Sequence, residues 1–110
     1  MTTIYHLAEP EHWTDALASG SYTQSTRGRT LAQEGFIHCS SAQQWPVVRR
    51  AFYADHPGPL LLLEIDEDRL AEPPVREVGN PATGEVFPHL YAALDPAAVV
   101  RVTELAPPHA

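Results

Sequence analysis

Lysine is absent from this chain of 110 residues, so its seven basic residues are all arginines, against fourteen acidic residues. The resulting formal charge of −7 argues against a protein that binds a nucleic-acid backbone, because such proteins normally present a basic face. Arginine suits planar phosphate or carboxylate groups. The complete lack of lysine nevertheless favours coding bias over a functional cause.

Cysteine is nearly absent as well. The single cysteine, Cys39, excludes an internal disulfide and a zinc site built on several cysteines, and it indicates a reduced thiol. Histidines at the short metal-binding spacings HxH or HxxxH are also missing. We therefore expect no metal cofactor.

Long apolar runs are missing too. The longest, residues 59–63, has the length of a strand and falls far short of the ~20 residues that span a membrane. The N-terminus lacks the basic and apolar regions of a secretory signal, which predicts a cytoplasmic protein. A chain of this length has room for one core and one cleft. We place a single domain at residues 1–105 and expect a disordered tail at 106–110.

Hydrophobic spacing and capping residues predict an α+β fold with mixed or antiparallel sheets. The two main helices fall in the N-terminal half. The first covers residues 10–19, and the second follows a capping box at Ser41 and Gln44 and ends near residue 53. The other elements expected in this half are strands at residues 3–7 and 35–39 and a helical turn near 30–33.

The C-terminal half is predicted to be mainly strand. Residues 60–65 form an apolar run, interrupted only by Glu64, after turn residues, which indicates a central strand buried on both faces. Pro88 interrupts the extended segment 86–91, and because proline lacks an amide donor we expect this segment at a sheet edge or a bulge. The remaining elements are a helical turn at 66–70, a strand at 75–78, a turn at 79–84 and a closing strand at 99–105.

Three histidines lie inside apolar stretches, where each ring needs a polar partner or a cavity: His6, His38 and His89. We interpret them as lining one shared pocket, and the alternative is a set of structural histidines bonded to the backbone. In an extended segment His38 and Ser40 share one face, while Cys39 takes the other. The thiol is then an inert small group in the core.

Two further features are candidates for the rim of this pocket. Glu85 follows a glycine turn, where a carboxylate can orient a ribose or accept a proton, and the alternative is a solvated turn residue. Arg27 and Arg29 lie in a polar loop, from which they can close over an anionic ligand. The other three histidines are expected to face solvent: His12, His56 and His109.

Several of these motifs together resemble the DUF952 family, a domain of unknown function. They are Ile4-Tyr5-His6, Trp13, Gly20, Tyr22, the run from Glu34 to Ser40, Phe52-Tyr53, the apolar run 60–65 and the run from Phe87 to Tyr91. The resemblance extends over about residues 3–102. It implies a compact relative of the ADP-ribosyltransferase-like fold, similar to the RNA 2′-phosphotransferases that consume NAD.

Carried onto this chain, the resemblance implies that His6 and His38 grip the nicotinamide riboside and the phosphates, with Ser40 beside them. Either Glu85 or His89 takes the third position, and the sequence does not decide between them. RNA is not the substrate we expect, because the chain is short and acidic.

The leading hypothesis is therefore NAD or nucleotide binding, with ADP-ribosyl- or phosphotransferase-like chemistry in a histidine-lined cleft. The expected catalytic residues are His38, Glu85 and His89, and the expected cofactor-binding residues are His6, His38, Ser40 and Arg27. One alternative is a non-catalytic binding module for a small metabolite or peptide. Another is a metal- or thiol-dependent hydrolase built on His38, Cys39 and His89. The oligomeric state stays open.

Overall fold

The computed structural model describes residues 2–110, which form two three-stranded antiparallel sheets and three α-helices. The first sheet has the strand order β1-β3-β6 and the second has the order β2-β5-β4. The strands are β1 (Thr3–Ala8), β2 (Ile37–His38), β3 (Leu60–Asp66), β4 (Val75–Asn80), β5 (Glu85–Leu90) and β6 (Val99–Leu105). The helices are α1 (Pro10–Ser19), α2 (Leu31–Glu34) and α3 (Trp45–Tyr53), with 3₁₀ turns at Glu67–Arg69 and Pro96–Ala98. The predicted α+β class is confirmed.

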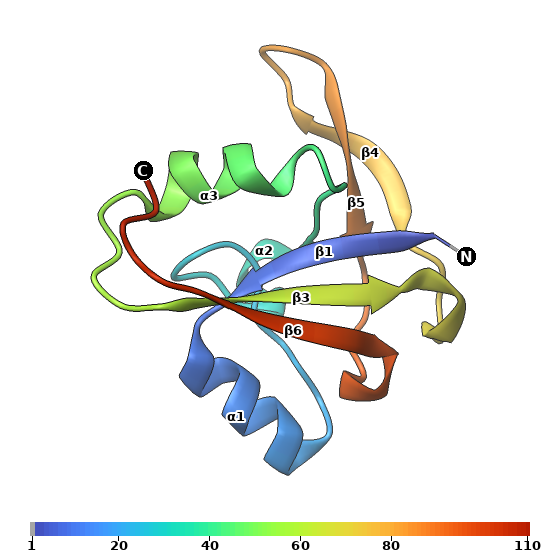
Figure 1. The fold of residues 1–110 in the computed structure, drawn as a ribbon. Coiled ribbons are helices and arrows are strands. Elements are labelled where there is room, and N and C mark those ends of the chain that lie inside the picture. The colour runs from blue at the N-terminus through green and yellow to red at the C-terminus, as the bar shows by residue number, and fades with distance from the viewer. Residues whose placement is uncertain (1) are drawn as a thin grey trace.

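Strand β3 is the central strand of the first sheet and is buried on both faces, as its apolar run predicts. Side chains alternate along a strand, so Leu60 and Leu62 pack on one face while Leu63 and Ile65 pack on the other. Figure 1 shows α3 and α1 on opposite sides of this sheet. The first pair packs with α3, and the second lies in a larger core shared with α1 and the second sheet.

The helix ends follow the capping residues of the sequence. Helix α1 ends at Gly20, whose φ of 84° lies in the left-handed region that glycine adopts without a steric penalty. Ser41 and Gln44 exchange the two hydrogen bonds of a capping box, and α3 begins only at Trp45. Pro46 therefore falls in the first turn, where its missing amide is not needed.

Within the described part of the chain, no helix is long and apolar enough to cross a membrane.

The position of Pro88 corrects one expectation, because its strand β5 is the central strand of the second sheet and not an edge. The Pro88 carbonyl accepts a hydrogen bond from the Cys39 amide at 3.0 Å. In an antiparallel ladder the nitrogen and carbonyl of one residue face the same neighbour, so the proline nitrogen also faces the β2 side. Strand β2 is shorter than the predicted 35–39 and has ended at this point. No hydrogen bond to β4 is lost.

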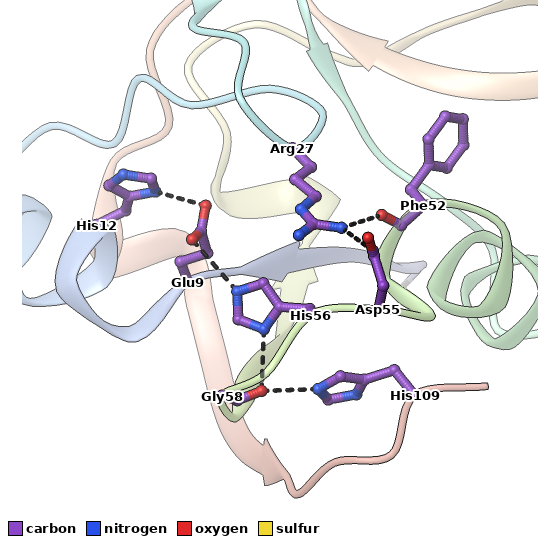
Figure 2. A network of polar contacts seen from close by, with 8 residues as sticks. All are labelled: Glu9, His12, Arg27, Phe52, Asp55, His56, Gly58 and His109. Atoms are coloured by element: carbon purple, nitrogen blue, oxygen red, sulfur yellow. Dashed lines mark hydrogen bonds and ion pairs between the residues drawn. The ribbon is translucent and has the colours of Figure 1, made fainter.

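The C-terminal tail differs from the expectation of disorder, since it packs against α3 and the loop that follows it. His109 is only 1 % exposed. Its Nδ1 accepts a hydrogen bond from Arg49 Nε at 2.9 Å, and its Nε2 donates to the Gly58 carbonyl at 2.8 Å. Figure 2 shows His56 bonded to the same carbonyl, through Nδ1 at 2.9 Å. These two histidines were expected in solvent and instead belong to a closed polar network.

Candidate functional site

An open cleft of about 680 Å³ lies on the second sheet. His38 of β2, His89 of β5 and Glu77 of β4 line it from the sheet. Arg27, from the loop before α2, and Phe52 of α3 line it from other sides. The cleft therefore brings together four of the residues that the sequence analysis selected, namely Arg27, Arg29, His38 and His89. Its volume lies within the roughly 300–1,000 Å³ of small-molecule sites.

His38 and His89 are neighbours across two paired strands. They stand directly opposite each other in the β2–β5 ladder, and their ring centroids are 5.4 Å apart. The Nε2 atom of each ring is buried and has no hydrogen-bond partner within residues 2–110. A buried polar atom without a partner costs about 1–3 kcal/mol. These two atoms are therefore where a ligand group gains most by supplying a hydrogen bond.

The state of the His38 ring follows from its surroundings. Burial, with smaller contributions from His6 and His89, lowers the pKa of His38 from 6.5 to about 4. The ring is neutral at neutral pH and offers one N–H donor and one lone pair. Such a ring recognises a ligand by directed hydrogen bonds and not by its charge.

Glu77 is a site residue that the sequence analysis missed. Its Oε1 atom lies 2.6 Å from His89 Nδ1 and also accepts a hydrogen bond from the Tyr91 hydroxyl. The bonds from Tyr91 and from His89 lower the pKa of the Glu77 carboxyl below its usual 4.5. On the His89 ring itself, Phe36 stacks with a centroid distance of 3.9 Å. His89 is thus held both at its edge and at its face.

The register of the β4–β5 hairpin is the signal that would have found Glu77. The ladder pairs Val75 with His89 and Glu77 with Phe87, so that Glu77 is the diagonal neighbour of His89. Diagonal neighbours on one face lie within reach of long side chains. Finding this pair requires the exact register of the hairpin, which the turn residues alone do not give.

Glu85 does not line the cleft, although the sequence analysis expected it at the rim. It begins β5 at the turn end of the hairpin, about 13 Å from His89 along the strand at the usual rise of ~3.3 Å per residue. Its carboxylate accepts a hydrogen bond from Gln44 Nε2 at 3.2 Å. The carboxylate beside the histidine pair is that of Glu77 instead.

His6 and Ser40 lie behind His38 and line a separate cavity of about 20 Å³, to which His38 also contributes. The His6 Nδ1 donates to the His38 carbonyl at 2.7 Å, which leaves Nε2 to accept from the Tyr22 hydroxyl at 2.9 Å. Burial lowers the pKa of His6 to about 4. Both nitrogens of His6 are already bonded, so this residue supports the strand that carries His38 and does not reach the cleft.

The two arginines of the cleft are attached to their surroundings. Arg27 Nη1 donates to Asp55 Oδ1 at 2.5 Å and to the Phe52 carbonyl at 3.1 Å, as Figure 2 shows. Arg29 forms an ion pair with Glu34 at 3.1 Å. A guanidinium has five N–H donors, so the remaining donors of each arginine are available to an anionic group.

Cys39 has no access to the cleft. It is fully buried, and burial raises the pKa of its thiol well above the usual value. The nucleophilic form, the thiolate, is therefore not accessible at neutral pH. Within residues 2–110, no group of three or more His, Cys, Asp or Glu side chains is arranged to hold a metal ion.

The family of this chain is decided by a match over most of its length. The family model described as protein of unknown function (DUF952) matches residues 7–102. The chain belongs to the DUF952 family. The resemblance that the sequence motifs indicate is thereby confirmed. No curated protein matches the chain.

Solved structures of protein CC0527 from Caulobacter crescentus are similar to this DUF952 chain. A crystal structure has a TM-score of 0.80 and 28% sequence identity, and it covers 94% of this chain and 86% of the other. A crystal structure of a double mutant of CC0527 gives 0.79 and 27%, with the same coverage. The solution NMR structure gives 0.72 and 27%, covering 96% of this chain and 86% of the other. The fold is therefore shared nearly from end to end with an experimentally determined protein.

Proposed function

We propose that this DUF952 protein binds NAD or a related nucleotide in the cleft, with His38 and His89 as its main polar contacts. The observation that carries the proposal is the pair of buried Nε2 atoms without partners in rings that line an open cleft. Buried polar side-chain atoms are hydrogen-bonded in the large majority of cases. Binding of a ligand that supplies both partners is therefore favoured by the free energy that the two unpaired atoms otherwise cost.

The walls of the cleft support a nucleotide over other small ligands. Phe36 and Tyr91 offer aromatic surfaces, with ring centroids 5.7 Å apart, on which a base or a nicotinamide ring can pack. Arg27 and Arg29 offer guanidinium groups that suit phosphate oxygens. A ligand with both a flat ring and phosphates uses both kinds of wall.

The residues proposed from the sequence divide into two layers. His38, His89 and Arg27 contact the ligand directly, because they line the cleft. His6 and Ser40 act from behind, where His6 holds the backbone of His38 in place. This division replaces the single shared pocket of three histidines.

The chemistry follows from the resemblance to ADP-ribosyltransferase-like proteins, which favours NAD as the nucleotide and transfer of ADP-ribose as the reaction. The bond between the ribose C1′ and the nicotinamide nitrogen breaks, its electron pair leaves with nicotinamide, and a nucleophile of the acceptor bonds to C1′. The ribose gains positive charge during this step, and an anion nearby stabilises it. Glu77 takes this role in place of Glu85, because it is the carboxylate bonded to His89.

Titration calorimetry with NAD tests the binding proposal. We expect wild-type protein to bind and His38→Ala to lose at least tenfold in affinity. His12→Ala is the matched control, because His12 lies on α1 outside the cleft, and its affinity should equal that of wild type. Identical heats from all three proteins, or no heat from wild type, contradict the proposal.

Release of nicotinamide separates the enzyme from the simple binding module. Wild type that binds NAD and releases nicotinamide over hours supports transfer chemistry, and binding without release supports a non-catalytic module. The thiol-dependent alternative loses its nucleophile, since Cys39 is buried away from the cleft. The same proposal assigns the protein to the cytoplasm, where a single thiol stays reduced.

A further inference from the structure

The Glu77 carboxylate receives two hydrogen bonds on the cleft side of the β4–β5 hairpin. One comes from the Tyr91 hydroxyl and the other from His89 Nδ1, at 2.6 Å. An ionised carboxylate has only acceptor sites, so the proton of the His89 bond belongs to Nδ1. The ionised state of Glu77 is itself favoured by these donors, which lower the pKa of its carboxyl.

This contact fixes the character of the other ring nitrogen. A neutral imidazole carries one proton, and with that proton on Nδ1 the Nε2 atom presents a lone pair. The Phe36 ring stacked on His89, at an angle of 17° between the planes, holds the ring orientation. Turning the ring would break the bond to Glu77, so the lone pair has a fixed direction.

The Nε2 atom of His89 is also the group that lacks a partner. The residue is 2 % exposed, and Nε2 has no hydrogen-bond partner within the described chain. His38 is its cross-strand neighbour. The Glu77 bond therefore does not complete the hydrogen bonding of His89; it leaves an acceptor at a ring that lines the cleft.

We propose that Glu77 is a positioning residue that holds His89 in the Nδ1–H tautomer, so that His89 Nε2 accepts a hydrogen bond from a ligand hydroxyl, such as that of a ribose. The ligand part of this proposal rests on the proposed function. An oxygen of a phosphate or a carbonyl has no proton to give and would place a second lone pair against Nε2. The cleft thus recognises the sugar at the histidine side and the phosphates at the arginine side.

The tautomer is tested without any ligand, by ¹⁵N NMR of histidine-labelled protein, with His89→Gln used to assign the ring. We expect a protonated Nδ1 and an unprotonated Nε2 for His89 in wild type near neutral pH. Tyr91→Phe keeps the Glu77 carboxylate and should leave this pattern unchanged. Glu77→Gln removes the obligate acceptor, and signal from the Nε2–H tautomer should appear.

A wild-type His89 that carries a proton on Nε2, as the Nε2–H tautomer or as the doubly protonated imidazolium, overturns the positioning role, and so does a Glu77→Gln spectrum equal to that of wild type. This result does not depend on whether any nucleotide binds. A merely structural role of Glu77 would change stability and leave the tautomer as it is.

The hydroxyl is tested by the affinity of NAD against NAD analogues that each lack one ribose hydroxyl. We expect one analogue to bind wild type about tenfold more weakly than NAD, and that difference to shrink below about twofold in Glu77→Gln and in His89→Gln. Equal affinities of all analogues for wild type overturn the hydroxyl assignment while NAD binding itself stands. Absence of NAD binding overturns the proposed function and the hydroxyl assignment together, and the tautomer is then decided by the NMR spectra alone.

Discussion

The molecule contains two groups of histidines, and they differ in whether the ring nitrogens have partners. At the C-terminal end, His109 bonds Arg49 and the Gly58 carbonyl, while His56 bonds the same carbonyl and, at 3.4 Å, Glu9. In the cleft, His38 and His89 each keep an Nε2 atom without a partner.

This difference teaches that burial of a histidine does not by itself mark a ligand site. His109 and His89 are almost equally buried, at 1 % and 2 % exposure. Completed hydrogen bonding identifies the first as a structural residue, and the open nitrogen identifies the second as a candidate contact. His6 belongs with the structural group, because both of its nitrogens are bonded.

The largest expected effect separates His6 from His38. His6→Ala removes a buried ring and leaves the Tyr22 hydroxyl and the His38 carbonyl without partners, so it should lower the free energy of unfolding by about 4 kcal/mol. His38→Ala should lower it by only about 1 kcal/mol and yet weaken NAD binding at least tenfold. Urea unfolding of both variants, with calorimetry of the second, measures the contrast. Equal losses of stability in His6→Ala and His38→Ala would contradict the predicted contrast.

The free energy of unfolding should decrease at acidic pH because of buried histidines. The pKa values of His6 and His38 fall from 6.5 to about 4 on folding, so the unfolded chain binds more protons between these two pH values. The free energy of unfolding is therefore unaffected by these two rings above pH 6.5 and falls as the pH drops to about 4, by about 3 kcal/mol for each histidine, because the folded protein resists protonation of the buried ring.

Denaturation of wild type and His38→Ala across this pH range isolates one of the two histidines. The variant should show a shallower decline, and subtraction cancels the carboxylates that titrate in both proteins. A decline of the same steepness in both proteins would refute the shifted pKa of His38.

In the closed group, loss of one ring should affect stability alone. His109→Ala removes a buried ring, the acceptor of Arg49 Nε and one of the two hydrogen bonds to the Gly58 carbonyl, which keeps its bond from His56, so the free energy of unfolding should fall by about 2 kcal/mol. NAD affinity should not change, because His109 does not line the cleft. His12→Ala controls for loss of a more exposed histidine and should change stability by less than about 0.5 kcal/mol. A fall in the NAD affinity of His109→Ala would contradict the division into structural and ligand-binding histidines.

A smaller effect is expected at the exposed end of the Glu77 contact. Tyr91→Phe removes one donor from a partly exposed carboxylate, and we expect a smaller loss of stability than in His6→Ala or His109→Ala. Glu77 then loses the first of the two bonds that depress its pKa, so the carboxyl should titrate at higher pH in the variant. ¹³C NMR of the Glu77 carboxyl follows this change. An unaltered titration would show that Tyr91 does not contribute.

Local patterns allowed most of the fold to be predicted. The apolar run 60–65 identified the central strand, and Gly20 marked the end of α1, because each signal depends on residues adjacent in the chain. The predicted position of Pro88 at a sheet edge was wrong. A proline is tolerated in the central strand β5 because β2, a strand distant in sequence, is short. The packed tail likewise depends on Arg49, far from His109 along the chain.

The candidate site was predictable in part, for the same physical reason. Apolar surroundings pointed to His38 and His89, and the structure brings these two together in the cleft. The choice of Glu85 over Glu77 depended on the hairpin register, which sets the diagonal pair at His89. No local pattern shows that both nitrogens of His6 find partners and that the ring therefore does not line the cleft.

One histidine-labelled ¹⁵N NMR titration with NAD tests the contrast between the two groups most directly, since every imidazole is observed at once. We expect saturable changes at the rings of His38 and His89, largest at Nε2, and none at His56 or His109. No change at the cleft histidines under saturating NAD, or changes centred on the C-terminal group, would contradict the account.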